Sequence, residues 1–195
     1  MAAPSPSTSD RPKRADARRN RDTLVAVARA AFAAQGGAAS LEAIAREAGV
    51  GIGTLYRHFP TRDILVEAVY SAELDDLVDS ARAALDRYPP DRALREWVRR
   101  YAEFAATKRG MMDTLRVSLA NGTLPMSSTR GRITSAIAPI LAAGAAQGSL
   151  RGDVEPGDVT SLLLGASLAT TAANATDRTQ RLLDLILDSL KPTGP

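Results

Sequence analysis

The chain has 195 residues, no cysteine and a formal net charge of +3. This length allows one or two compact units with a hydrophobic core, and the lack of cysteine excludes disulfides. The charge is uneven, because residues 1–62 hold ten Lys/Arg and five Asp/Glu, whereas the remaining 133 residues carry a net charge of −2. A basic end on a near-neutral body is typical of a module that binds a polyanion, although a solvated basic tail would give the same composition.

The first 17 residues are expected to form a disordered basic tail. The opening sequence MAAPSPSTSD has neither the basic nor the apolar segment of a signal peptide, so we expect a cytoplasmic protein. Two uncharged runs, residues 133–150 and 159–176, are long enough to span a membrane. Both contain several polar residues, so we expect no membrane insertion.

The rest of the chain is predicted to be all-α, with about nine helices. Apolar residues recur at intervals of three and four, and no sustained strand pattern occurs. The first helix is expected over residues 18–35, where Gly36 and Gly37 stop it. Ser40 is a suitable N-cap for a second helix, which ends at Gly49 after about two turns.

A third short helix is expected over residues 51–58, before Pro60, which cannot continue it. Thr61 caps a fourth helix that runs to about residue 85. Five further helices are expected, at residues 91–107, 108–119, 129–147, 158–173 and 177–190. No flexible linker separates the basic N-terminal third from the rest, so the domain boundary is expected inside the fourth helix.

The run GVGIGTLYRHFP, residues 49–60, has three glycines at alternate positions. A dinucleotide-binding loop needs G-x-G-x-x-G after a strand, but the third glycine would fall on Thr54 or Tyr56, and the preceding LEAIAREA has helical periodicity. A helix-turn-helix explains the run better, because two short helices must cross tightly. Gly49 then forms the turn, and Gly51 is the N-cap of the next helix.

Several side chains remain on the outer face of this third helix. Thr54 and Tyr56 carry hydroxyls suited to phosphate oxygens, and Gly53 permits close approach of the DNA backbone. Arg57 and Ile52 are candidates for contact with base edges or a thymine methyl group. The third helix is therefore the candidate DNA-reading element.

Arg62, in the first turn of the fourth helix, is a candidate phosphate clamp. Tyr56 and His58 have the alternative of packing against the fourth helix. An enzyme would need a nucleophile, an acid–base pair or a metal cluster, but the only histidine lies on the candidate reading helix and cysteine is absent. We expect a binding protein and not an enzyme, with no metal and no other cofactor.

The stretch ASLEAIAREAGVGIGTLYRHFPTRDILVEAV resembles the DNA-binding domain of the TetR/AcrR family of bacterial transcriptional regulators. The resemblance implies a helical homodimer whose third helix enters the major groove. It implies a DNA-binding domain over residues 18–70, with the helix-turn-helix at about residues 40–59, and an effector-binding and dimerisation domain over residues 71–195. By position, the family's DNA contacts fall on Ser40, Ile52, Gly53, Thr54, Tyr56, Arg57, His58 and Arg62.

The sequence departs from the family at the start of the third helix. Many members have a serine and a polar or basic residue where this chain has Gly51 and Ile52. Arg14, Arg18 and Arg19 are expected to compensate through phosphates or the minor groove.

The C-terminal part is expected to hold a small effector and a second subunit, as the resemblance implies. The candidate effector-binding residues are Trp97, Tyr101, Phe104, Met111 and Met112. The candidate dimer-interface residues on the last two helices are Leu162, Leu163, Ala166, Leu183, Ile186 and Leu190. In both cases the alternative is packing within a single subunit.

The sequence thus predicts a DNA-binding transcriptional regulator. We expect a ligand-responsive repressor that binds a palindromic operator in double-stranded DNA as a homodimer, with an unknown small-molecule effector. The alternatives are a ligand-independent architectural DNA-binding protein and an activator.

Overall fold

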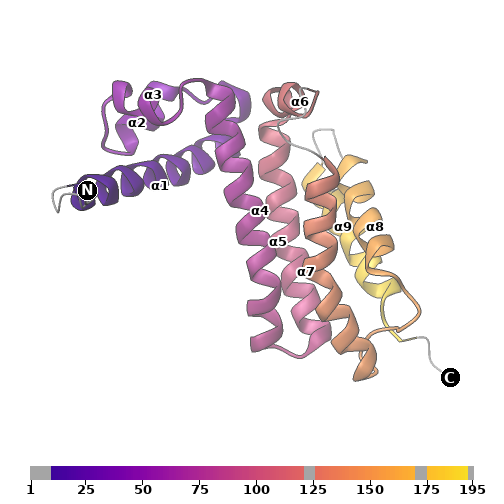
Figure 1. The fold of residues 1–195 in the computed structure, drawn as a ribbon. Helices are drawn as coiled ribbons and strands as arrows, with labels where there is room; N and C mark the ends of the chain where they lie inside the picture. The colour runs from indigo at the N-terminus through magenta and orange to yellow at the C-terminus, as the bar shows by residue number, and fades with distance from the viewer. Residues whose placement is uncertain (1–9, 121–125, 170–174, 193–195) are drawn as a thin grey trace.

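The computed structural model describes residues 10–120, 126–169 and 175–192, which form helices without any strand (Figure 1). The elements are α1 (Asp10–Gln35), the short 3-10 helix η1 (Gly36–Ala38), α2 (Leu41–Glu47), α3 (Ile52–His58), α4 (Arg62–Arg87), α5 (Pro90–Gly110), α6 (Met112–Ala120), α7 (Met126–Ala146), α8 (Pro156–Leu168) and α9 (Ala175–Ser189). The predicted all-α fold is confirmed. Within the described part, no helix is both long and apolar enough to cross a membrane.

The helices form a small N-terminal block and a longer body (Figure 1). α1, α2 and α3 make up the block, and α4 runs from the block along the body beside α5. α7 packs against α4, α5 and α8, and α9 packs against α8 and α5. α6 lies at the end of the body that is nearest to the block. α4 is therefore a continuous connection between the two parts.

Local sequence signals set the ends of the helices in the block. The Ser40 hydroxyl accepts a hydrogen bond from the Ala43 N–H (3.3 Å), and the Thr61 hydroxyl accepts one from the Ile64 N–H (3.3 Å), so both are N-caps as predicted. Gly49 has a φ of +71°, a left-handed conformation that glycine adopts without strain. The predicted turn between α2 and α3 is thus confirmed.

The structure differs from the predicted N-terminal tail, because α1 begins at Asp10 and residues 10–17 are helical. Alanine and arginine are strong helix formers, and Pro12 falls in the first turn, where its missing N–H breaks no hydrogen bond. The run of charges favours a disordered tail on composition, but the local helix propensity is the stronger influence. Residues 1–9 of the predicted tail lie outside the described residues.

A buried carboxylate on α4 holds α1 against the body. Glu73 is only 4% exposed and forms an ion pair with Arg29 of α1, whose Nη1 also lies 2.8 Å from Asp76 Oδ2. Burial raises the pKa of Glu73, and the positive charge of Arg29 opposes that rise. Ion pairs therefore hold the block against the body, in addition to the covalent connection through α4.

The ends of α1 and α5 also meet, backbone to backbone. A Cβ atom placed on Gly110 would lie 2.6 Å from the carbonyl oxygen of Phe32. A Cβ atom on Gly36, which has a φ of +57°, would lie 3.2 Å from the carbonyl oxygen of Gly110. Glycine is required on both sides of this contact, because no side chain separates the two helix ends.

One hydrophobic core runs through both parts of the molecule. Phe32, Leu55 and Phe59 of the block belong to the same buried cluster as Leu94 and Ile137 of the body. Because close-packed interiors transmit displacement, a movement of core side chains in the body would also displace residues of the block.

Gly110→Ala is expected to lower the free energy of unfolding by about 1–3 kcal/mol, because the added methyl group would overlap a backbone carbonyl that cannot rotate away. Urea unfolding followed by circular dichroism measures this change. Gly131→Ala is the matched control: Gly131 is an exposed helical glycine whose Cβ would meet nothing within 4 Å. The control should keep or raise the stability, and equal stabilities of the two variants would contradict the close contact.

Candidate nucleic-acid interface, ligand pocket and dimer face

α2 and α3 cross around a small buried core. Ile44 and Ala45 of α2 and Leu55 of α3 are buried, and the Val50 N–H donates to the Ala45 carbonyl across the turn (3.0 Å). Phe59, directly after α3, is also buried. This packing fixes the angle between the helices and leaves the opposite face of α3 in solvent.

The outer face of α3 brings together most of the residues predicted to contact DNA. Ile52, Gly53, Tyr56 and Arg57 are exposed, Tyr56 to 45%, while Thr54 is half-buried. A Cβ atom on Gly53 would meet nothing within 4 Å, so a partner can approach the backbone there. An exposed isoleucine and tyrosine one turn apart are typical of a surface that contacts a partner.

Two internal hydrogen bonds hold Arg57 in place before any partner binds. Its Nε donates to the Gly53 carbonyl (3.2 Å), and its Nη2 donates to the Thr54 hydroxyl oxygen (3.2 Å). Neither bond uses Nη1 or the hydroxyl proton of Thr54, so both can be offered to a ligand. A side chain that is already ordered loses less entropy when it binds.

His58, at the end of α3, is half-buried, and its ring centroid lies 6.3 Å from that of Phe59. The DNA contact of His58 and its packing against α4 both stay predictions. Among the described residues, no cluster of histidine and acidic side chains could hold a metal ion.

Ser40, one of the residues at which the resemblance places a DNA contact, already makes two hydrogen bonds within the chain. Besides capping α2, its hydroxyl donates to Glu42 Oε2 (2.8 Å). The hydrogen bond from Ser40 and a backbone hydrogen bond lower the pKa of Glu42. The Ser40 proton is thus already donated, to a carboxylate that would repel a phosphate.

Arg62 also differs from the predicted phosphate clamp. Its Nη1 donates to the Ala39 carbonyl (2.6 Å) and its Nη2 to the Gly37 carbonyl (2.8 Å), while its guanidinium carbon lies 5.2 Å from the Phe32 ring centroid. The side chain therefore holds the segment before α2 against α4 and α1. It positions the helix-turn-helix instead of reaching outward.

The predicted arm arginines belong to α1 and carry their own counterions. Arg18 Nε lies 4.0 Å from Asp22 Oδ2, and Arg19 forms an ion pair with Asp16. All four side chains are exposed, so these pairs are weak and can exchange for a phosphate. The side chain of Arg14 lies outside the described residues.

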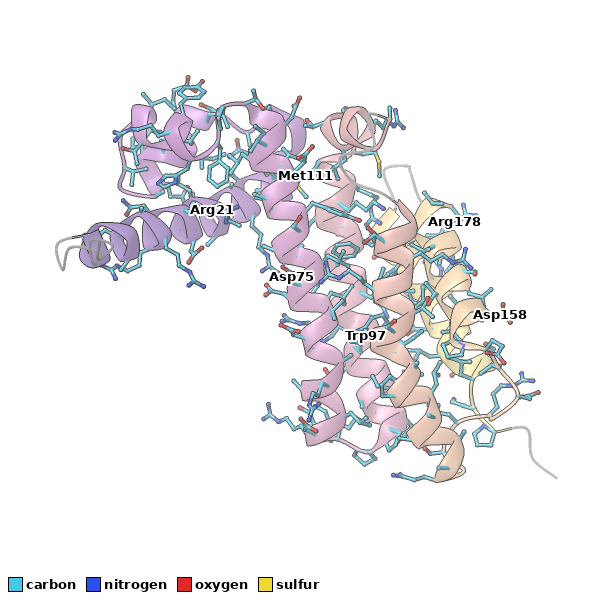
Figure 2. The ribbon with its side chains drawn as sticks, in the orientation of Figure 1. Arg21, Asp75, Trp97, Met111, Asp158 and Arg178 are labelled. Carbon is cyan, nitrogen blue, oxygen red and sulfur yellow. The ribbon has the colours of Figure 1, made fainter. Side chains whose placement is uncertain are left out.

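Arg21 is a residue of this surface that the sequence analysis did not single out. Its guanidinium carbon lies 5.3 Å from the ring centroid of Phe59, beside the end of α3 (Figure 2). Its spacing of three residues before the buried Leu24 could have placed it on the side of α1 that faces α3.

A cavity of about 90 Å³ lies between α5 and α8 in the body. Three of the predicted effector residues, Tyr101, Phe104 and Met112, line it. The full lining set is Tyr101, Phe104, Ala105, Lys108, Arg109, Met112, Leu164, Ser167 and Leu168. The Tyr101 hydroxyl lies 3.0 Å from Ser167 Oγ, and burial raises the pKa of Tyr101 to about 12.

The other two predicted effector residues, Trp97 and Met111, are buried and do not line this cavity. Trp97 Nε1 donates to the Leu77 carbonyl (3.0 Å), which ties α5 to α4, and its ring stacks on Tyr101 at a centroid distance of 5.9 Å. Trp97 is thus part of the core and lies against Tyr101, which lines the cavity.

A second apolar surface is a groove of about 450 Å³ between α8 and α9. Its lining residues are Ser161, Leu162, Gly165, Ala166, Ala169, Leu182, Leu185, Ile186 and Ser189. Leu162 is 51% exposed and Leu185 is 64% exposed, and together they belong to a contiguous apolar surface, which is typical of a site that contacts a partner. Leu162, Ala166 and Ile186 of the predicted interface lie here, together with Leu185.

The remaining predicted interface residues, Leu163, Leu183 and Leu190, are buried within this single chain. Their side chains face the interior of the body, so they cannot offer surface to a second subunit. α8 is apolar on nearly every side, and sequence periodicity alone does not identify which side faces outward.

Comparison with known proteins identifies both parts of the chain. A model of bacterial regulatory proteins of the tetR family matches residues 24–69, and a model of the SbtR-like transcriptional regulator C-terminal domain matches residues 89–192. The TetR transcriptional regulator SCO0520 from Streptomyces coelicolor is similar at 44% identity with a TM-score of 0.78, covering 89% of this chain and 99% of that chain. A TetR regulatory protein from Mycobacterium vanbaalenii is 33% identical, with a TM-score of 0.70, over 91% of this chain and 98% of its own.

The curated relatives match over a shorter stretch. The HTH-type transcriptional regulator SAUSA300_2515 of Staphylococcus aureus is 36% identical over 76 residues, which is 38% of this chain. That stretch spans 41% of the relative's length. The family models and the matched structures describe transcriptional regulators, not enzymes.

Arg62→Ala is expected to lower the free energy of unfolding by about 1–3 kcal/mol, because two backbone carbonyls lose their charged donor. Arg82→Ala is the matched control on the same helix. The Arg82 side chain is exposed, and its Nε lies 3.9 Å from Oδ2 of the exposed Asp86, so its loss should change the stability little. Thermal and urea unfolding of both variants measure the difference. A similar loss in the two variants would show that Arg62 does not hold the segment before α2.

Proposed function

This chain belongs to the TetR family of DNA-binding transcriptional regulators, and we propose that it is a ligand-responsive repressor that binds a palindromic operator as a homodimer. In this proposal residues 18–70 bind DNA, and residues 71–195 bind the effector and the second subunit. The observation that carries the proposal is the preoriented outer face of α3 at one end of a body that has an apolar groove and a cation-lined cavity.

The proposed DNA contacts centre on α3 in the major groove. The hydroxyls of Thr54 and Tyr56 are suited to phosphate oxygens, and the open backbone at Gly53 allows close approach. Arg57 offers Nη1 to a base edge, and Ile52 offers an apolar contact to a thymine methyl group. Positive charge near the DNA phosphates would also come from Arg18, Arg19 and Arg21 of α1.

The proposed dimer pairs the groove between α8 and α9 with the same groove of a second copy. Gly165, Ala166 and Ala169 are small and would allow the helices to approach closely, while Leu162 and Leu185 would be buried. Such a pair would relate two copies of α3 by a two-fold axis, and binding to a palindrome would require them to lie about 34 Å apart.

The proposed response to ligand runs from the cavity to the block. Gly110, which ends α5 next to the cavity residues Lys108 and Arg109, meets the end of α1 backbone to backbone. A ligand that prefers a conformer with a shifted α5 would move the block and disturb the spacing of the two reading helices. Release of the operator would follow.

Footprinting on the protein's own promoter region tests the operator. We expect a protected palindrome whose half-sites are centred about one helical turn apart. Tyr56→Phe should weaken operator binding about tenfold, because one hydrogen bond to a charged group is lost, without changing the salt slope, because the phenol is neutral. Tyr88→Phe, remote from α3, should bind as the wild type does.

The alternatives give different results in the same assays. An architectural DNA-binding protein would give weak, uniform protection with no palindrome. An activator would protect a palindrome but raise transcription from this promoter in vitro, whereas the proposed repressor lowers it.

Leu185→Glu is expected to raise the dimer Kd about 100-fold, because each of the two subunits loses the burial of one leucine side chain in the interface. Sedimentation velocity over a dilution series measures the dimer Kd. Ala142→Glu, at an exposed position of α7, is the control and should leave the dimer intact. Dimers of equal stability in the two variants would exclude the groove as the interface.

A further inference from the structure

The cavity between α5 and α8 combines apolar walls with two positive charges. Phe104, Met112, Leu164 and Leu168 supply the apolar surface, together with Ala105, and Lys108 and Arg109 supply the charge. No aspartate or glutamate is among its described lining residues. The two internal stretches outside the described residues, 121–125 and 170–174, contain no acidic residue either.

Lys108 is largely withdrawn from water without a carboxylate partner among the described residues. Burial lowers the pKa of Lys108, and its Nζ lies 5.9 Å from the ring centroid of Tyr70. Contact with an aromatic face offsets only part of the cost of removing an ammonium from water. An anion beside Lys108 would restore the missing interaction.

Arg109 has an enclosed donor of its own. Its Nη1 is buried and has no hydrogen-bond partner within the described part of the chain. A guanidinium stays charged in proteins, so Arg109 cannot escape this cost by losing a proton. Buried donors without partners are rare in folded proteins, and Arg109 is also one of the residues that line the cavity.

We propose that the ligand of this cavity is an amphipathic monocarboxylate, with its carboxylate held by Lys108 and Arg109 and its apolar chain packed against Phe104, Leu164 and Leu168. The hydroxyls of Tyr101 and Ser167 lie 3.0 Å apart on the wall, and Ser167 Oγ also donates to the Leu163 carbonyl (3.0 Å), so these two groups are paired within the chain. Leu168 is mostly exposed at the end of α8, so a chain longer than the enclosed volume would continue along it. This inference names the chemical class of the effector and rests on the proposed ligand response.

The charge of the ligand can be tested with the intact wild-type protein. Trp97 is the only tryptophan and stacks on Tyr101, so its fluorescence reports on the cavity wall. The probes are octanoate, octanol and octylamine, which share a chain and differ in the charge of the head. We expect octanoate to bind at least about tenfold more tightly than octanol, and octylamine not to bind.

Two variants assign the charge to its residues. Lys108→Met and Arg109→Met should each weaken octanoate about tenfold and leave octanol unchanged, because methionine keeps the apolar stem and removes the cation. Arg95→Met, at an exposed position of the same helix, is the matched control and should bind octanoate as the wild type does. Equal affinities of the wild type for octanoate and octanol, or no binding of octanoate, would overturn the proposal.

Footprinting with the same three probes separates this inference from the proposed function. Octanoate that binds in the fluorescence assay and releases the promoter DNA supports both. Octanoate that binds but leaves the footprint unchanged supports the ligand class and contradicts the ligand response. A release of DNA by octanol equal to that by octanoate contradicts the assignment of the carboxylate to Lys108 and Arg109.

Discussion

The buried ion pair between Arg29 and Glu73 is the interaction on which the arrangement of the molecule depends. Glu73 lies on α4, inside the body, and the largest compensation for its burial is the charge of Arg29 on α1, to which Arg100 of α5 adds a smaller share. Removing Arg29 would leave the buried carboxylate without its ion-pair partner. The block therefore cannot rotate freely about α4. Arg62 holds the other side of the block, and Gly110 sets how closely α5 approaches it.

An aromatic cluster connects this ion pair to the cavity between α5 and α8. Phe104 lines the cavity and also lines the small cleft that Arg29 and Glu73 enclose. Its ring centroid lies 5.7 Å from that of Tyr70 and 6.3 Å from that of Tyr101. A change of the Phe104 rotamer would alter both sites at once, because packed interiors leave little free space. The cavity between α5 and α8 is thus connected to the Arg29–Glu73 ion pair through side chains of α4 and α5.

The sequence predicted those features that depend on neighbouring residues. Helices begin or end at Ser40, Gly49 and Thr61 through contacts within a few residues. These helix ends can therefore be predicted without knowledge of the fold. The partners of Arg62 and Trp97 are backbone carbonyls distant in sequence, which leave no pattern. The outward side of α8 and α9 depends on which apolar side meets the body, so Leu163 and Leu183 were interchangeable with Leu162 and Leu185 until the packing was known. Lys108 and Arg109 looked like ordinary solvated charges, because the neighbours that enclose them come from other helices.

The shortness of α3 limits how much information one subunit can carry. A helix of seven residues is about 10 Å long, which spans roughly three base pairs. A sequence of three base pairs recurs by chance about once in 64 positions. In the proposed dimer, two such sequences at a fixed interval would recur about once in 4,000 positions, whereas a genome offers at least about a million competing sites. In the proposed dimer, the remaining sequence specificity must come from the DNA next to the two half-sites. Its sources are the deformability of the DNA between them and the groove width beneath the arginines of α1.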